Sequence, residues 1–208
     1  MLSALVSSLL QVLALTGVAF LAYLPVRRAA PGFRAWVGLT APQGRTLLEG
    51  LGLGLVGALA MMLLFSLPGF RELAGGPNTV AGKLRAAGPS ASTLVQLVLY
   101  AVVQTALAEE IFFRGFLAKR LIGWLGFPAG SIVQALLFGA LHLLLFVGAG
   151  EGAFSPARAA GVAGVTTLLG WALAALNETR GNGSILPGWT AHAVVNLLTY
   201  AVLAFRPW

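Results

Sequence analysis

The 208-residue chain has no cysteine and no aspartate, so its negative charge comes from only six glutamates. Without cysteine there can be no disulfide, no thiolate metal site and no cysteine nucleophile. Charged residues make up 9% of the chain, whereas roughly a quarter is usual in soluble domains. The net charge of +7 comes from 13 scattered lysines and arginines rather than from a basic block that would bind nucleic acid. The composition excludes an ordinary soluble domain and a nucleic-acid partner.

Long apolar runs take the place of the missing charge. Apolar residues make up 58% of the sequence, and the mean hydropathy is +0.89. Six runs are each close to the roughly 20 residues that a helix needs to cross the hydrocarbon core. They cover residues 2–24, 47–67, 93–116, 129–147, 161–177 and 184–204. Since the runs are uniformly apolar and lack the alternation of barrel strands, they predict an all-α, polytopic transmembrane helix bundle with about six spans.

The connections suggest the organisation of the bundle. We expect residues 1–92 to form N-terminal transmembrane helices and connecting loops, and residues 93–208 to form the helical core. The glycine-rich connection 69–92 is predicted to include an interfacial piece, and 148–160 has the composition of a flexible loop. Seven basic residues on the side of Lys119 against five on the other side favour an outside N-terminus. Eleven arginines to two lysines suggest a prokaryote, so we expect a multi-pass protein of a prokaryotic cytoplasmic membrane.

Two short sequence patterns match known functional motifs without indicating the corresponding function. Residues 52–57 spell GxGxxG, the dinucleotide fingerprint, but they lie inside an apolar span and not after a strand. Gly50 and Gly54 form GxxxG, which instead predicts close helix packing in lipid. The glycosylation sequon that begins at Asn177 is interpreted as a chance match.

Polar side chains inside the later spans recur at helical intervals. The third span carries Glu109, Glu110 and Arg114, and carboxylates at bilayer depth indicate a functional site because they are costly there. Glu110 and Arg114 are four residues apart, so they share a helix face and can form an ion pair. Glu109 is rotated by about 100° from Glu110 and should remain free for proton chemistry.

Both histidines of the chain lie in spans of the same core. His142 ends the sequence Phe138-Gly139-Ala140-Leu141-His142, and His192 precedes Asn196 by four residues, so these two share a face. Counted from the side of Lys119, Glu109 lies roughly 15 Å deep, His192 about 12 Å and His142 about 20 Å at 1.5 Å per residue. We therefore expect the three to line one cavity that opens to the Lys119 side.

These residue types favour hydrolysis of an acyl bond. A glutamate and a histidine can activate water as general bases, and a second histidine with an asparagine can stabilise an oxyanion. A competing interpretation is zinc, because Glu109, His142 and His192 form a ligand set of hydrolytic type, although the HExxH spacing is absent.

Together, Glu109-Glu110-Ile111-Phe112-Phe113-Arg114, Phe138…His142 and His192…Asn196 resemble the EExxxR, FxxxH and HxxxN motifs of the CPBP family. This family comprises the CAAX prenyl protease type 2 (Rce1-like) enzymes and the bacteriocin-processing or Abi proteins. The resemblance implies an intramembrane endopeptidase acting on a membrane-embedded or lipidated peptide or protein, prenylated CaaX-type substrates included. It also implies that Glu109 and His142 activate water, that His192 and Asn196 stabilise the oxyanion, and that Glu110 and Arg114 support the site.

Within that resemblance we favour a metal-independent glutamic protease without a cofactor, because it gives both histidines roles other than metal binding. A zinc metalloprotease is the alternative. Outside proteolysis, the same scaffold would suit a non-catalytic immunity or partner-binding protein, or a proton-coupled transporter. The expected partners are the membrane-embedded or lipidated substrate and membrane lipids, and no nucleic acid.

Overall fold

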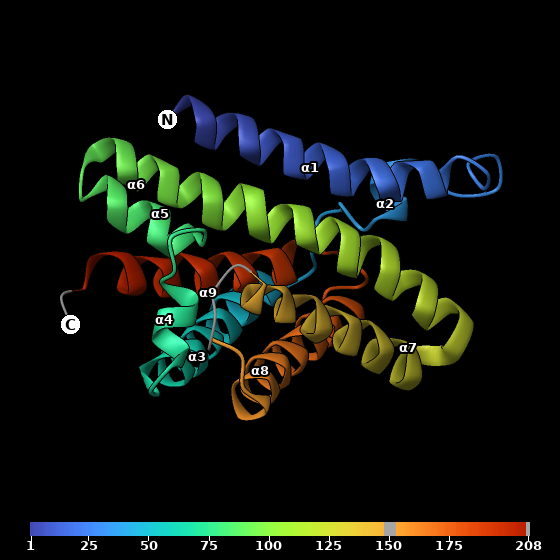
Figure 1. Cartoon of the computed structure of the whole chain (residues 1–208). Coiled ribbons are helices and arrows are strands. Elements are labelled where there is room, and N and C mark those ends of the chain that lie inside the picture. The colour runs from blue at the N-terminus through green and yellow to red at the C-terminus, as the bar shows by residue number, and fades with distance from the viewer. Residues whose placement is uncertain (148–152, 207–208) are drawn as a thin grey trace.

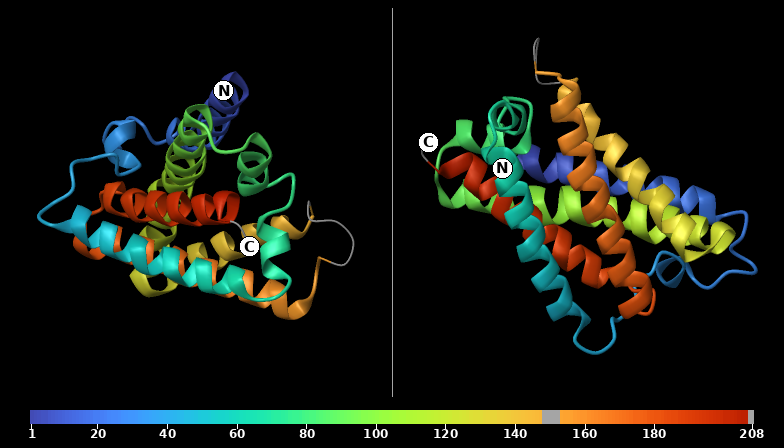
Figure 2. Two further views of the ribbon diagram at one scale, coloured as in Figure 1. Left: turned by 90° about the vertical axis from the view of Figure 1, so that its left-hand side faces the viewer. Right: turned by 90° about the horizontal axis from the view of Figure 1, so that it is seen from below.

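The structure, a computed structural model, describes residues 1–147 and 153–206. Within these residues every element is a helix, and the long helices pack into one bundle (Figures 1 and 2). The long elements are α1 (Leu2–Tyr23), α3 (Thr46–Ser66), α8 (Pro156–Ala175), α9 (Leu186–Phe205) and a continuous helical unit over Ala91–Phe146. All five are long and apolar enough to cross a membrane. The predicted all-α polytopic bundle is confirmed, and the chain is an integral, multi-pass membrane protein.

The unit Ala91–Phe146 contains two spans. It joins α6 (Ala91–Val98), η1 (Leu99–Leu107), η2 (Glu110–Ala118), α7 (Lys119–Leu141) and η3 (His142–Phe146). As one straight helix its 56 residues would extend about 84 Å, far beyond the roughly 30 Å hydrocarbon core. Instead α7 turns sharply at Gly126, where φ is 76° and ψ is 165°, and the two arms fold back on each other (Figure 1). The arms correspond to the third and fourth predicted spans.

Glycine allows α3 to lie directly against α9. A Cβ at Gly54 would lie 2.8 Å from the carbonyl oxygen of Ala191, and one at Gly50 would collide with the carbonyl of Pro187. Small residues let helix backbones approach closely in lipid, where no hydrophobic effect drives association. The packing role predicted for this pair is confirmed.

The connection between α3 and α6 covers one end of the bundle with the short helices α4 (Phe70–Ala74) and α5 (Val80–Ala87). The Thr79 hydroxyl caps α5 by accepting from the Gly82 amide at 3.1 Å, an arrangement that satisfies an otherwise free donor. Arg85 donates to the Leu203 carbonyl near the C-terminal end of α9 and so holds α5 against this helix. We call this the α5 end. Of the predicted flexible loop 148–160, residues 148–152 lie outside the described residues.

The opposite end of the bundle, which we call the Lys119 end, is tied together by polar contacts. The Lys119 ammonium lies 2.7 Å from Glu178 Oε1 and donates to the Gly183 carbonyl at 2.7 Å. The segment after α2 (Phe33–Trp36) joins in, because the Ile185 amide donates to the Gly38 carbonyl at 2.9 Å. The loop between η4 (Leu176–Arg180) and α9 is thereby fixed beside α2.

Candidate active site

The acidic pair lies where the third span departs from regular α-helical winding. Glu109 directly precedes the π-helical segment η2, and η1 before it is π-helical as well. Two side chains of α9 donate to carbonyls of η1: Trp189 Nε1 to Val102 O at 2.9 Å and Asn196 Nδ2 to Ala101 O at 3.4 Å. π-Helical winding is rare and occurs frequently at functional sites. Here it extends over nine residues in each of η1 and η2, and the bonds to η1 hold α9 beside the acidic pair.

Glu110 and Arg114 form the ion pair that their spacing predicts. Arg114 Nη1 lies 2.9 Å from Glu110 Oε1, and both side chains are fully buried. The guanidinium also lies over the ring of Phe138, with its central carbon 4.1 Å from the ring centroid, a favourable cation–π arrangement. A buried carboxylate without a cation would be strongly destabilising, and Arg114 is the cation that lies against Glu110 here.

Glu110 in turn orients His192. The Nδ1–H of His192 donates to Glu110 Oε1 at 3.1 Å, so Nε2 is directed to the other side of the ring. There Nε2 lies 3.8 Å from Glu109 Oε2. A carboxylate that accepts from one ring nitrogen fixes the orientation of the other, as in the second shells of metal sites and catalytic triads. The two glutamates therefore differ in surroundings, since Glu110 is held by Arg114 and His192.

His142 is fixed by its own helix. Its Nδ1 donates to the Phe138 carbonyl at 2.8 Å, and its ring packs edge-on against the ring of Phe138 with centroids 4.6 Å apart. With the proton on Nδ1, the lone pair of Nε2 is available to accept a hydrogen bond. The four-residue spacing of the FxxxH pattern thus sets both the tautomer and the position of this histidine.

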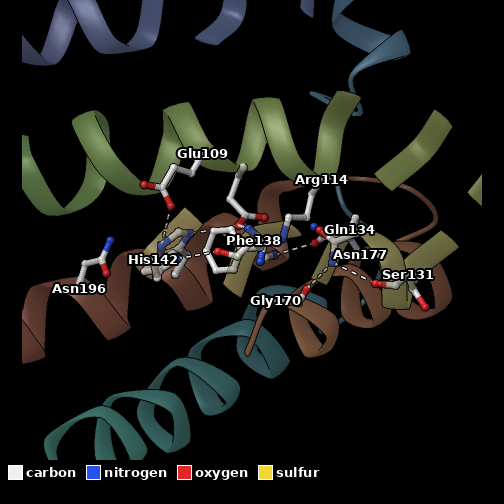
Figure 3. Close-up of polar contacts among 12 residues, drawn as sticks. Glu109, Arg114, Ser131, Gln134, Phe138, His142, Gly170, Asn177 and Asn196 are labelled. Carbon is white, nitrogen blue, oxygen red and sulfur yellow. Dashed lines mark hydrogen bonds and ion pairs between the residues drawn. The ribbon is translucent and has the colours of Figure 1, made fainter. Parts of the chain in front are cut away.

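A cavity of about 380 Å³ brings the predicted residues together, and its lining includes Glu109, His142, His192 and Asn196. His192 Nε2 lies 3.8 Å from Glu109 Oε2 across the cavity, and Asn196, labelled in Figure 3, follows one turn along α9. Glu110 and Arg114 do not line this cavity and lie behind it, fully buried. The structure therefore assembles all six predicted residues at one place, in two layers, and their catalytic roles remain predictions.

The predicted direction of the cavity is wrong. From Glu109 and His192 the cavity extends toward the α5 end, where Ala74 and residues 78–81 line it. Toward the Lys119 end lie the buried pair Glu110–Arg114 and the contacts of Lys119. Counting residues along a helix gives depth, but it does not show which end other segments block.

The zinc alternative does not fit the geometry of the described residues. Among residues 1–147 and 153–206, no three histidine or glutamate side chains converge closely enough to hold a metal ion. Tetrahedral zinc requires ligand distances of about 2.0–2.2 Å from several side chains at once.

Two buried amides that the sequence interpretation missed complete the inner layer. Asn177 Oδ1 accepts from the Gly188 amide at 2.7 Å, and Gln134 Nε2 donates to the Gly170 carbonyl at 3.0 Å (Figure 3). Both amides are fully buried, and buried polar groups are costly unless they are paired. Their position inside apolar segments was the available signal, but Asn177 was interpreted only as part of a chance sequon.

Comparison with known proteins places this site in a family. The model of the family described as Type II CAAX prenyl endopeptidase Rce1-like matches residues 91–198, which is more than half of the chain and includes all six site residues. No curated protein and no solved structure matches the chain. The division at residue 92, the membrane orientation and the prokaryotic location remain predictions.

Proposed function

Since the chain belongs to the Type II CAAX prenyl endopeptidase Rce1-like family, we propose that it cleaves a membrane-embedded or lipidated peptide or protein with water activated by Glu109 and His142. Membership supports a CAAX-type intramembrane protease in general terms. The observation that carries the finer proposal is that Glu109, His142, His192 and Asn196 line one cavity, backed by a fully buried ion pair.

Glu109 is the proposed base. Its carboxylate lines the cavity, and Oε2 is buried without a hydrogen-bond partner among the described residues. A water held between this carboxylate and Nε2 of His142 would give its proton to Glu109 as it attacks the scissile carbonyl carbon. The same carboxyl group then returns the proton to the leaving amine when the tetrahedral intermediate collapses.

Side chains of α9 would stabilise the negative charge that develops on the carbonyl oxygen. His192 and Asn196 lie one helical turn apart and both line the cavity, so they can direct two donors to one oxygen. The 3.4 Å bond from Asn196 to the Ala101 carbonyl is long, so the amide can exchange it for the oxyanion at little cost.

The oxyanion role of His192 requires a proton on each ring nitrogen. The Nδ1–H is already donated to Glu110 at 3.1 Å, so a second donor at Nε2 exists only in the doubly protonated ring. Nε2 is the ring nitrogen on the side of Glu109, 3.8 Å from its Oε2.

The experiment compares membranes that carry the wild-type protein with membranes that carry Glu109→Gln, and identifies by proteomics the peptides released only in the first. Glu49→Gln is the matched control, because Glu49 forms an exposed ion pair with Arg180 and does not line the cavity. We expect cleavage to stop in Glu109→Gln and to continue in Glu49→Gln. Cleavage retained by folded Glu109→Gln would refute the proposal.

Two further arms separate the alternatives. Chelator treatment should leave cleavage unchanged, and a loss that only a divalent cation restores would contradict metal-free catalysis. A Glu109→Gln, His142→Ala double variant that still protects cells or binds a partner would instead support a non-catalytic role. Substrate flux in proteoliposomes would support a transporter.

A further inference from the structure

The polar stripe on α9 continues beyond the residues that the proposed mechanism uses. His192, Asn196 and Tyr200 follow one another at four-residue intervals, and all three line the cavity. Residues four apart lie on one face of a helix, so Tyr200 extends the stripe toward the α5 end. Thr199 lines the cavity beside it. Both hydroxyl residues lie just beyond the part of the chain that the family match covers.

The opposite wall of the cavity carries a matching stripe. Thr105 and Glu109 are four residues apart on the third span and both line the cavity. Tyr200 faces the same cavity from α9. A phenol has one O–H donor and lone pairs that accept, so Tyr200 can donate to a carbonyl oxygen in the cavity.

The Thr199 side chain has a hydrogen-bonding group that the protein itself leaves unpaired. Its Oγ1 is buried and has no hydrogen-bond partner among the described residues. Three other helical threonines, Thr166, Thr179 and Thr190, donate to the carbonyl four residues earlier, whereas Thr16 in α1 shares the unpaired state but does not line the cavity. A buried hydroxyl that forgoes this local bond requires an explanation, and a polar ligand in the cavity supplies one.

We infer that the hydroxyl pair Thr199–Tyr200 is a substrate main-chain subsite, in which Tyr200 donates to the peptide carbonyl two residues from the scissile one. The inference rests on the proposed function. Along α9, Asn196 and Tyr200 are separated by four residues, or about 6 Å of axial rise. In an extended peptide, carbonyls on the same side recur every two residues, at about 6.6 Å. An extended substrate along α9 therefore presents one carbonyl to Asn196 and the next on that side to Tyr200.

In this arrangement Tyr200 and Thr199 are positioning residues, since they touch the substrate away from the reacting atoms. They bind any peptide through its backbone, so they fix the register of the chain without selecting its side chains. The subsite lies between the catalytic residues and the α5 end. The segment of substrate that it holds is the one nearer to residues 78–81.

The test uses a quenched-fluorescent peptide, taken from a sequence that the wild-type protein releases, and two analogues. In each analogue an (E)-alkene replaces the peptide bond whose carbonyl lies two residues from the scissile carbonyl, on one side or the other. We expect Tyr200→Phe to lower kcat/KM for the parent peptide about fivefold, the loss of one neutral hydrogen bond, mainly through KM. For one of the two analogues, Tyr200→Phe should have no effect, because the carbonyl that it binds is already absent.

Control variants make the result specific. Tyr100→Phe is the matched control, because Tyr100 is buried beside Leu84 and Ala204 and does not line the cavity. It should leave all three rates unchanged. Thr199→Val, which keeps the shape and removes the hydroxyl, should lower kcat/KM for the parent peptide as well.

Two negative results would separate failure of the subsite from failure of the proposed function. If Tyr200→Phe lowers the rates of all three peptides equally, or of none, the subsite is refuted while proteolysis stands. If the wild-type protein cleaves no peptide at all, the proposed function fails and the subsite fails with it.

Discussion

Replacing Arg114 by methionine tests whether the buried ion pair maintains the site. The guanidinium and the Glu110 carboxylate are 2.9 Å apart and neither is exposed. Methionine keeps a long, flexible apolar side chain in the space but removes the positive charge. Glu110 would then be a buried carboxylate whose remaining partner is the Nδ1–H of His192 at 3.1 Å.

The expected loss of stability follows from these contacts. Removing one partner of a buried pair costs about 3–5 kcal/mol, because the other charge is left uncompensated. Losing the contact of the guanidinium with the Phe138 ring, 4.1 Å away, adds about 1 kcal/mol. The bond from His192 offsets part of the first term. We therefore expect Arg114→Met to lower the free energy of unfolding by about 3–5 kcal/mol.

The decisive comparison is the double variant Glu110→Gln, Arg114→Met. It removes both charges while the glutamine Oε1 can still accept from His192, so about 2 kcal/mol or more of the loss should be recovered. The free energies of unfolding can be measured by SDS titration in mixed micelles for wild-type protein, both single variants and the double variant. A double variant no more stable than Arg114→Met would refute the reasoning, as would an Arg114→Met protein as stable as the wild type.

Two glycines give further predictions. In Gly188→Ala the new Cβ would lie 2.5 Å from Asn177 Nδ2 and 2.8 Å from Glu110 Oε2. We expect the free energy of unfolding, measured by SDS titration, to fall by about 1–3 kcal/mol and peptide cleavage to decrease. Unchanged values would contradict the close packing. Gly126→Ala places a side chain at φ 76° with no atom within 4 Å of the new Cβ, so backbone strain alone should cost about 1–3 kcal/mol. Gly123→Ala, in open space within the helix, is its control and should cost nothing, and equal effects of the two variants would argue against the strained turn.

The spans were predictable because hydropathy and length depend on local sequence. The run 2–24 became α1 (Leu2–Tyr23), and 47–67 became α3 (Thr46–Ser66). The third and fourth runs were less well delimited, because the helix continues through residues 117–125 and turns only at Gly126. A polar stretch between apolar runs is compatible with either a loop or a continuing helix. The position of the turn depends on the backbone conformation of a single glycine, Gly126.

The site was predictable where it depends on helical spacing and not where it depends on long-range packing. The pairing of Glu110 with Arg114 follows from their separation of four residues. The closure of the Lys119 end requires the segment at Gly38 to meet Ile185, a contact between distant parts of the chain that no local pattern encodes. The buried amide of Asn177 was missed for the same reason, because its partner Gly188 follows only after a turn.

The scarcity of acidic residues bears on which one is the base. Glu49 is paired with Arg180, Glu178 with Lys119 and Glu110 with Arg114. Glu109 faces His192 at 3.8 Å and lines the cavity. Glu49, Glu110 and Glu178 do not line the cavity, so their carboxylates cannot reach a water molecule held there, whereas Glu109 can. Of the four, Glu109 is therefore the one whose carboxylate can take a proton from water and give it back, and Glu109→Gln should stop proteolysis without the loss of stability expected when Arg114 is removed.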